Sequence, residues 1–274
     1  MLKFGGKFGV MAVCGAAAAI FGAVPVSAQD DPVFCPNRPS LGASACITAP
    51  GHVQVEVSAL DWQRDDNGDE REDTILAGDF EARFGVARMT EVQVSWTPVG
   101  RVRTRDKATG MVDTTTGIGD LRLGVRQNFR NPDGDGLSFG AEPFVTLPIG
   151  RDPVGAGDWG AGIVLPVTYE VSEAVQLSFT GEGEAAVDDD GDGRHLAYSG
   201  ILGLGYSLTE TLTATAELSV LRDDDPMGHH TETATAGSIA WEPRKNLQLN
   251  MLAVAGLNHD TPDLRLVTGG AVLF

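Results

Sequence analysis

The sequence predicts an all-β protein, a transmembrane antiparallel up-and-down β-barrel of about 12 strands. Three observations predict this fold class. The chain opens with the pattern of an export signal, its remainder alternates between apolar and polar side chains, and its last strand ends on Phe274. The expected parts are a signal peptide (1–28), a periplasmic N-terminal segment (29–51) and the outer-membrane barrel (52–274).

The first part has the composition of a secretory signal peptide. Lys3 and Lys7 give a positive start, the run from Gly9 to Val24 is small and apolar, and Val26-Ser27-Ala28 is an A-x-A-like cleavage site. A transmembrane anchor is the alternative, but this run is too short and too rich in Gly and Ala for the roughly 20 residues that a spanning helix needs. We therefore expect cleavage after Ala28 and export.

Two cysteines remain after the signal, Cys35 and Cys46, close together in a Pro-rich stretch. In an exported protein such a pair predicts one disulfide. Metal binding is the alternative, but two thiolates without a nearby His make a poor site. We expect the bridge to order the N-terminal segment and to do no chemistry.

The strands are predicted from period-two alternation. Gln176 to Asp188 shows it best, because Leu177 and Phe179 fall on one face while Glu182 and Glu184 fall on the other. The remaining expected strands are Val53–Ala59, Leu76–Val86, Glu91–Pro98, Leu121–Phe129, Leu137–Ile149, Trp159–Tyr169, Leu196–Tyr206, Leu212–Val220, Thr233–Trp241, Leu247–Leu257 and Leu264–Phe274.

Longer and shorter connections take turns along the chain. An acidic loop is expected at 61–73, a tight turn at 87–89, a long loop at 100–117 and a turn at 131–136. Transmembrane barrels have short periplasmic turns and longer external loops, so both chain ends are expected in the periplasm. A secreted soluble β-sandwich is the alternative, but it has no reason to sort its loops in this way.

Four stretches also carry a family resemblance: Phe34-Cys35-Pro36-Asn37-Arg38-Pro39, Pro50-Gly51-His52-Val53-Gln54-Val55-Glu56, Val145-Thr146-Leu147-Pro148-Ile149-Gly150 and Trp159-Gly160-Ala161-Gly162. Together they resemble the outer-membrane transporters grouped as the "MetA-pathway of phenol degradation" family, over nearly the whole mature chain. The resemblance implies a channel-like barrel, in some members encoded near pathways for aromatic compounds. It brings no firm set of binding residues.

Charged side chains on the polar faces of the strands are the first candidate site. If their apolar neighbours face lipid, these side chains point into the barrel, where opposed acidic and basic walls orient polar solutes and filter ions. A ladder of salt bridges that stiffens or plugs a narrow barrel is the alternative, and both can coexist. The expected lumen-lining residues are Glu56, Asp79, Glu81, Arg83, Asp120, Arg122, Arg126, Glu142, Glu182, Glu184, Glu217 and Arg265.

External loops hold the second candidate site. Residues 188–193 begin like a calcium-binding loop, and several histidines fall in the last three external loops. Hairpin turn chemistry explains the Asp and Gly residues, and exposed histidines are usually only solvated. No metal is therefore expected, and the surface candidates are Asp188, Asp190, Asp192, His195, His229, His230 and His259.

The expected function is passive uptake of small solutes, apolar or aromatic, through a porin-like channel in the outer membrane of a Gram-negative cell. A sealed structural or adhesion-type barrel acting through its acidic external loops is the alternative. The expected partners are a small-molecule solute, outer-membrane lipid and lipopolysaccharide, and the barrel-assembly machinery, which reads signals resembling Phe274 at a strand end.

Enzymatic activity, cofactors and nucleic acid are not expected. The formal net charge is −18, from 20 Lys and Arg against 38 Asp and Glu, whereas phosphate binding along nucleic acid needs concentrated Lys and Arg. His195 and Ser199 share one face of a strand but lie too far apart for direct contact, so they do not predict a nucleophile and its base.

Overall fold

The computed structural model describes residues 32–191 and 193–274, which form strands and connections without a helix. The expected signal peptide and its cleavage site lie outside these residues. In the described part, no helix is long and apolar enough to cross a membrane. The strands are β1 (Val53–Asp66), β2 (Glu70–Ala77), β3 (Asp79–Ala87), β4 (Thr90–Trp96), β5 (Val99–Asp106), β6 (Val112–Gly117), β7 (Leu121–Arg130), β8 (Leu137–Leu147), β9 (Gly160–Ser172), β10 (Val175–Val187), β11 (Arg194–Thr209), β12 (Leu212–Asp223), β13 (His230–Arg244), β14 (Leu247–Gly256) and β15 (Leu264–Leu273).

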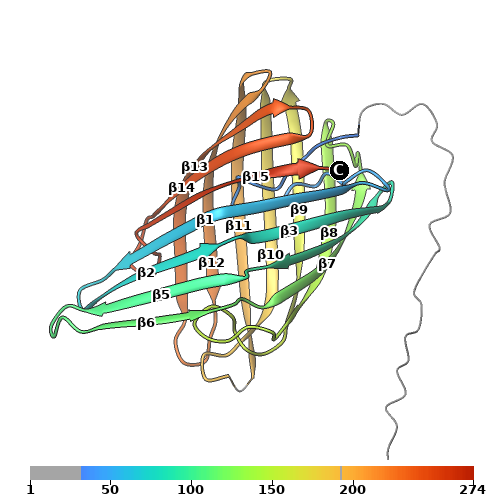
Figure 1. Ribbon diagram of the computed structural model, residues 1–274. Coiled ribbons are helices and arrows are strands. Elements are labelled where there is room, and N and C mark those ends of the chain that lie inside the picture. The colour runs from blue at the N-terminus through green and yellow to red at the C-terminus, as the bar shows by residue number, and fades with distance from the viewer. Residues whose placement is uncertain (1–31, 192) are drawn as a thin grey trace, which may run out of the picture. The chain divides into compact units, whose positions relative to one another are not determined.

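These strands form a closed antiparallel barrel (Figure 1). Three positions in it are held by interrupted strands: β2 continues into β3 across Gly78, β4 into β5 across residues 97–98, and β6 into β7 across residues 118–120. β1 pairs with β2 and β3 on one side and with β15 on the other, which closes the ring. Counting each interrupted strand once gives twelve positions, and the predicted fold class is confirmed.

The interruptions have local causes. Gly78 has a φ of 72°, a conformation outside the strand region that glycine adopts without steric cost. Pro98 has no backbone N–H to donate to a neighbouring strand. The pairing of β1 therefore passes from β3 to β2 at Gly78, whose N–H donates to Ser58.

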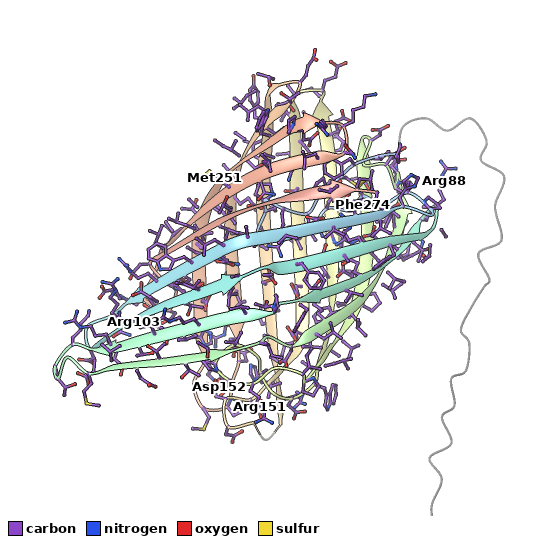
Figure 2. All side chains as sticks on the ribbon, in the orientation of Figure 1. Arg88, Arg103, Arg151, Asp152, Met251 and Phe274 are labelled. Carbon is purple, nitrogen blue, oxygen red and sulfur yellow. A yellow bond between two sulfur atoms is a disulfide. The ribbon has the colours of Figure 1, made fainter. Side chains whose placement is uncertain are left out.

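The two ends of the barrel differ in their connections. One end, here called the short-turn end, carries Phe274 and the turns at 88–89, 173–174, 210–211 and 245–246. The opposite, long-loop end carries the connections at 148–159, 188–193, 224–229 and 257–263. Figure 2 shows Arg88 near Phe274 and Arg151 at the other end. Transmembrane barrels usually have their short turns on the periplasmic side, so the short-turn end is the one expected to face the periplasm.

The barrel reverses the usual distribution of side chains between interior and surface. On β1 the buried residues are Gln54, Glu56, Ser58 and Asp61, and the first three are fully inaccessible to solvent. On β11 the exposed residues include Leu202 and Leu204. Polar groups inside and an apolar outer wall are stable only when the wall faces lipid, because water would favour the opposite arrangement.

Two expected loops are wrong, because the structure forms strands there. Residues 61–73 belong mostly to β1 and β2, and residues 100–117 mostly to β5 and β6. Together with the second half of β1, strands β2, β5 and β6 form a sheet, here called the flap, that runs to the far left of Figure 1. Most residues on both faces of its strands are polar, so the strands lack the regular apolar alternation that predicts a strand.

The closure between β1 and β15 depends on a close approach at Gly269. A Cβ atom there would lie 2.0 Å from the carbonyl oxygen of Val57 and 3.0 Å from the Cα of Ser58. The β1 register also shifts between Ser58 and Leu60, beside this contact. A side chain at residue 269 would therefore push the closing strands apart.

We predict that Gly269→Ala lowers the stability of the folded barrel by about 1–3 kcal/mol, as overpacking does. The measurement is the urea concentration at which the heat-modifiable folded band disappears from a denaturing gel. Gly183→Ala is the matched control, because nothing lies within 4 Å of a Cβ at Gly183. Equal midpoints for the two variants would contradict the close-approach argument.

Candidate functional site: the barrel interior

The N-terminal segment, residues 32–51, lies inside the ring of strands. The N–H of Arg38 donates to Glu56 on β1 at 2.8 Å, and the N–H of Leu41 donates to Glu217 on β12 at 3.1 Å. Gln248 on β14 donates to the carbonyl of Arg38 at 2.6 Å. Contacts to such widely separated strands of the ring are possible only for a segment that crosses the interior, whereas the sequence suggested a segment in the periplasm.

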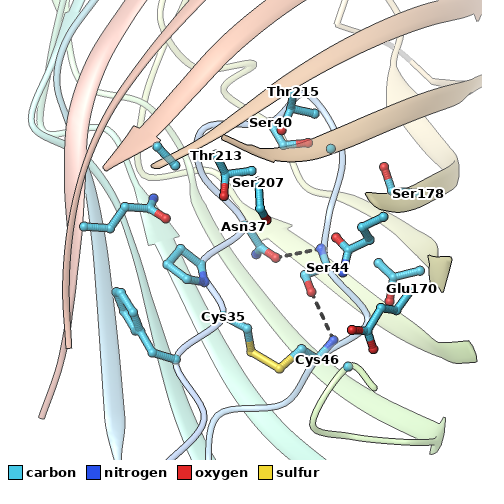
Figure 3. A pocket seen from close by; sticks show the side chains of 18 of the residues that line it. Cys35, Asn37, Ser40, Ser44, Cys46, Glu170, Ser178, Ser207, Thr213 and Thr215 are labelled. Atoms are coloured by element: carbon cyan, nitrogen blue, oxygen red, sulfur yellow. Dashed lines mark hydrogen bonds between the residues drawn. A yellow bond between two sulfur atoms is a disulfide. The ribbon is translucent and has the colours of Figure 1, made fainter. Parts of the chain in front are cut away.

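The predicted disulfide between Cys35 and Cys46 is present. Within the loop that it closes, the N–H of Ser44 donates to the side-chain oxygen of Asn37 at 2.9 Å (Figure 3). Arg83 on β3 donates to the carbonyl oxygens of both cysteines, each at 2.7 Å. One buried guanidinium therefore holds both ends of the disulfide loop against the wall.

Arg83 also begins a chain of ion pairs around the wall. It lies 3.3 Å from Glu56 and 2.9 Å from Glu91, and all three side chains are inaccessible to solvent. Arg126 lies 3.4 Å from Glu91 and 2.6 Å from Glu142. Alternating signs fix each buried charge between opposite ones, which buried charges require.

The chain ends where the wall becomes more open. Arg122 on β7 lies 3.9 Å from Glu142 and 3.2 Å from Glu182 on β10, and its guanidinium lies over the ring of Phe144. About a third of the Arg122 side chain remains accessible. The ladder thus spans β1, β3, β4, β7, β8 and β10 and passes from a dry part to a wet part of the interior.

The other expected lumen residues differ in their surroundings. Asp79 pairs with Arg38 of the N-terminal segment at 2.6 Å, and Arg265 pairs with Asp61 at 2.6 Å. Glu81 accepts a hydrogen bond from Asn37 at 2.6 Å. The remaining expected residues are Asp120, described next, and Glu184, which is half-buried on the face of β10 that carries Glu182.

Asp120 organises a loop beside the wall. Its carboxylate accepts the N–H groups of Gly150 at 2.8 Å and Ala156 at 2.7 Å. Both donors belong to the long connection after β8. The carboxylate therefore holds this connection beside the start of β7.

Two buried charged residues of the inner wall were missed in the sequence, Glu91 of the ladder and Asp61, the partner of Arg265. The sequence does contain the signal for Glu91, because Glu91, Gln93 and Ser95 alternate with Val92 and Val94 and so fall on the inward, polar face of the strand. Asp61 was placed in a loop, because the alternation of β1 is shifted by the irregularity between Ser58 and Leu60.

The opposite wall carries an apolar patch. Five inward-facing residues of β13, β14 and β15 form a buried cluster, and Leu41 of the N-terminal segment packs against it. The cluster consists of Ala234, Ala236, Leu252, Val254 and Val267. The interior thus has a charged side and an apolar side.

Two cavities lie on either side of the N-terminal segment. The first, of about 390 Å³, is lined by the disulfide loop and by short-turn-end residues such as Glu170 and Glu242 (Figure 3). The second, of about 420 Å³, is lined by Arg122, Glu182 and Leu252 among others. Residues 37–40 border both cavities, so they form the partition between them.

Residues 136–140, Gly-Leu-Ser-Phe-Gly, fit the G-x-S-x-G pattern of hydrolases. Ser138 lies fully buried in β8 and accepts a hydrogen bond from Asn128 at 2.9 Å. A nucleophile of that class stands exposed on a strand-to-helix turn, so this match does not indicate a catalytic serine.

At the long-loop end, His195 meets three carboxylates. Its Nδ1 lies 2.9 Å from Asp188 and 3.3 Å from Asp225, and its Nε2 lies 2.9 Å from Asp223. Burial alone would raise the pKa of Asp225, but backbone N–H groups of Asp189 and Met227 and the neighbouring His195 hold it below its usual value. Donor atoms of Asp188, His195 and Asp225 lie within 4.8 Å of one another, close enough to share a cation. A protonated His195 imidazolium would neutralise these carboxylates equally well without a metal ion.

The other loop candidates do not join this cluster. His229 is exposed and lies 3.7 Å from Asp224, and His230 lies 3.8 Å from Glu232. His259 lies in the exposed connection before β15. Asp190 has no ligand role in the cluster, and Asp192 lies outside the described residues.

We predict that His195→Ala loosens the connections at 188–193 and 224–229, because three carboxylates would face one another without a cation. Local opening should become easier by about 1–3 kcal/mol, which is roughly a five- to 150-fold faster amide hydrogen exchange. His229→Ala, at an exposed histidine, is the control. Unchanged exchange in both connections would show that the cluster does not hold them.

Comparison with solved structures supports the fold. The COG4313 outer membrane channel from Pseudomonas putida F1 is similar with a TM-score of 0.67 and 14% identity, over 84% of this chain and 97% of that chain. The KdgM porin in complex with disordered oligogalacturonate is more distant, with a TM-score of 0.47 and 10% identity over 78% of this chain and 98% of that chain. No curated protein matches the chain significantly.

A family model with the description "Putative MetA-pathway of phenol degradation" matches residues 36–273. This range includes Cys46 and the loop before it, the ladder, the apolar cluster and all the strands, and it begins one residue after Cys35. The resemblance seen in the sequence is thereby confirmed, and the chain belongs to the MetA-pathway of phenol degradation family.

Proposed function

We propose that the protein is an outer-membrane channel for the passive uptake of small solutes, narrowed by its own N-terminal segment. The supporting observation is the pair of cavities that residues 37–40 separate inside the barrel. A solute moving between them must pass this partition. The proposal agrees with the P. putida relative, which is described as an outer membrane channel.

The two-sided interior favours a small aromatic solute that carries a polar group. The second cavity combines Arg122 and Glu182 with Leu41, Leu252 and Val267. Sites that bind small molecules typically join an apolar lining with a few placed polar groups. A phenol-like compound fits this combination, and the family description names phenol degradation.

A sealed barrel is the second candidate function, supported by the anchoring of the segment. Backbone N–H groups of Asn37 and Arg38 bind Glu56, and the N–H of Ala43 binds Thr180 at 2.9 Å. Such a segment could close the lumen permanently, leaving the acidic connections of the long-loop end to act. Folded protein that leaves planar bilayers non-conducting would favour this candidate and overturn the channel.

If the lumen conducts, we predict a preference for cations, because acidic side chains outnumber arginines on the inward faces. Glu182→Gln with Glu184→Gln should move the reversal potential in a KCl gradient toward zero. Glu70→Gln with Glu210→Gln removes equal charge at two exposed sites outside both cavities and should leave it unchanged. If both double variants shifted the reversal potential equally, the carboxylates of the inner wall would not line the path of the ions.

The aromatic preference is tested in the same bilayers by adding phenol or an aliphatic alcohol of similar size. Phenol should interrupt the current more often, since it contacts the apolar cluster and the ladder together. Leu252→Asn with Val267→Asn should remove this difference while conductance remains. If phenol and the aliphatic alcohol blocked the unsubstituted protein equally, the proposed preference for aromatic solutes would be wrong. The proposal that the protein is a channel would not be affected.

We also propose that Phe274 is an assembly signal. It follows β15 directly, its side chain is exposed, and its backbone exchanges hydrogen bonds with Val53 at 2.8 and 3.1 Å. We predict that deleting Phe274 strongly reduces the heat-modifiable folded protein in outer-membrane fractions but not refolding of the purified chain into detergent. Loss of refolding in detergent would indicate a structural role instead.

A further inference from the structure

Five arginines gather on the outer face of the flap. The strand register aligns Arg64 of β1 with Asp73 of β2 and Arg103 of β5, and aligns Arg71 with Arg105. Because Asp61 of β1 faces inward to pair with Arg265, alternation turns Arg64 and its partners outward. Figure 2 shows Arg103 on this face. The arginine patch consists of Arg64, Arg71, Arg101, Arg103 and Arg105.

The patch begins where the apolar band of the outer wall ends. Along β1 the outward residues run from Val57 and Leu60 through Trp62 to Arg64. Along β5 the same change occurs between Val99 and Arg101. Tryptophan is enriched at the interface between hydrocarbon and headgroups, so the arginines stand at headgroup level. This is the long-loop end, where the outer leaflet lies.

The positive charge of the patch is only partly neutralised within the protein. Asp73 lies 3.0 Å from both Arg64 and Arg71 and 3.9 Å from Arg103. Arg101 and Arg105 are exposed, and neither forms an ion pair or hydrogen bond with the described residues. Arg105 is moreover paired directly across the strands with Arg71, an arrangement that costs stability unless an anion lies between them.

We propose that the arginine patch binds the phosphate groups of lipopolysaccharide in the outer leaflet. Guanidinium groups bind phosphate oxygens in pairs of parallel hydrogen bonds, and Arg101, Arg103 and Arg105 follow each other every second residue on one strand. Trp62 and Val99, just below them, face the acyl chains of the same molecule. The chain as a whole is acidic, with a formal net charge of −18, so this cluster of arginines is a local departure from its overall charge.

The site does not depend on the proposed channel. It is formed on the outer wall by the flap, whereas the ladder and both cavities are formed by inward-facing residues. A barrel with a sealed lumen would bind the lipid equally well. The placement in the outer membrane is the only part of the preceding proposals that the site requires.

The test is the affinity of the purified full-length protein, in a neutral detergent, for fluorescent lipid A that carries both phosphates. Arg101→Gln, Arg103→Gln and Arg105→Gln together should weaken binding about tenfold or more, since three charged contacts are lost. Arg88→Gln, Arg130→Gln and Arg244→Gln remove the same charge from exposed sites at the short-turn end and should leave binding unchanged. Arg105→Gln alone should give a smaller loss of affinity, and it replaces the triple variant if that variant does not fold, because the Arg105 side chain is exposed and has no partner among the described residues.

Further probes identify the group that is bound. Dephosphorylated lipid A should bind the unsubstituted protein as weakly as intact lipid A binds the triple variant, and millimolar inorganic phosphate should not displace the lipid. Equal affinity for the two lipids, an equal loss in the short-turn control, or full displacement by inorganic phosphate would each overturn the proposal. Equal binding of phosphatidylglycerol would show a general attraction to anionic lipid and would overturn it as well.

Discussion

The guanidinium of Arg83 is the constraint on which the interior depends. All five of its N–H groups are used: toward Glu56, toward both oxygens of Glu91, and toward the carbonyls of Cys35 and Cys46. It therefore joins the first, third and fourth strands to the N-terminal segment. A guanidinium buried without these partners would be strongly destabilising, so wall and segment are stable only together.

This dependence explains how a segment without regular secondary structure can occupy the barrel. The wall supplies acceptors, such as Glu56 and Glu217, for backbone N–H groups that no strand would otherwise pair. The disulfide reduces the freedom that the segment loses when it is ordered. On the opposite side, Leu41 meets the apolar cluster of β13, β14 and β15. The interior thus has a charged side and an apolar side, the N-terminal segment contacts both, and the proposed solute follows from that combination.

The outer wall shows a second division of chemistry. Its apolar band faces lipid, and on the flap the band ends in arginines although the chain as a whole is strongly acidic. The flap is also where strand prediction failed, because strands that extend beyond the hydrocarbon lose the apolar residues on their outer face. The change from apolar to charged residues on the outer face therefore explains why the strands were not predicted from alternation. The same change marks the level of the headgroups.

The sequence by itself determined the class of fold, the strand number, the disulfide and the family, because these rest on local alternation, on turn residues and on two neighbouring cysteines. It also showed which charges share a face with one another, as for Glu182 and Glu184. Only the tertiary structure decided that residues 32–51 lie inside the ring, that Arg83 joins Glu91, and that Asp188 meets Asp225 at His195. These contacts join residues far apart in the chain, and closure of the ring alone brings them within reach.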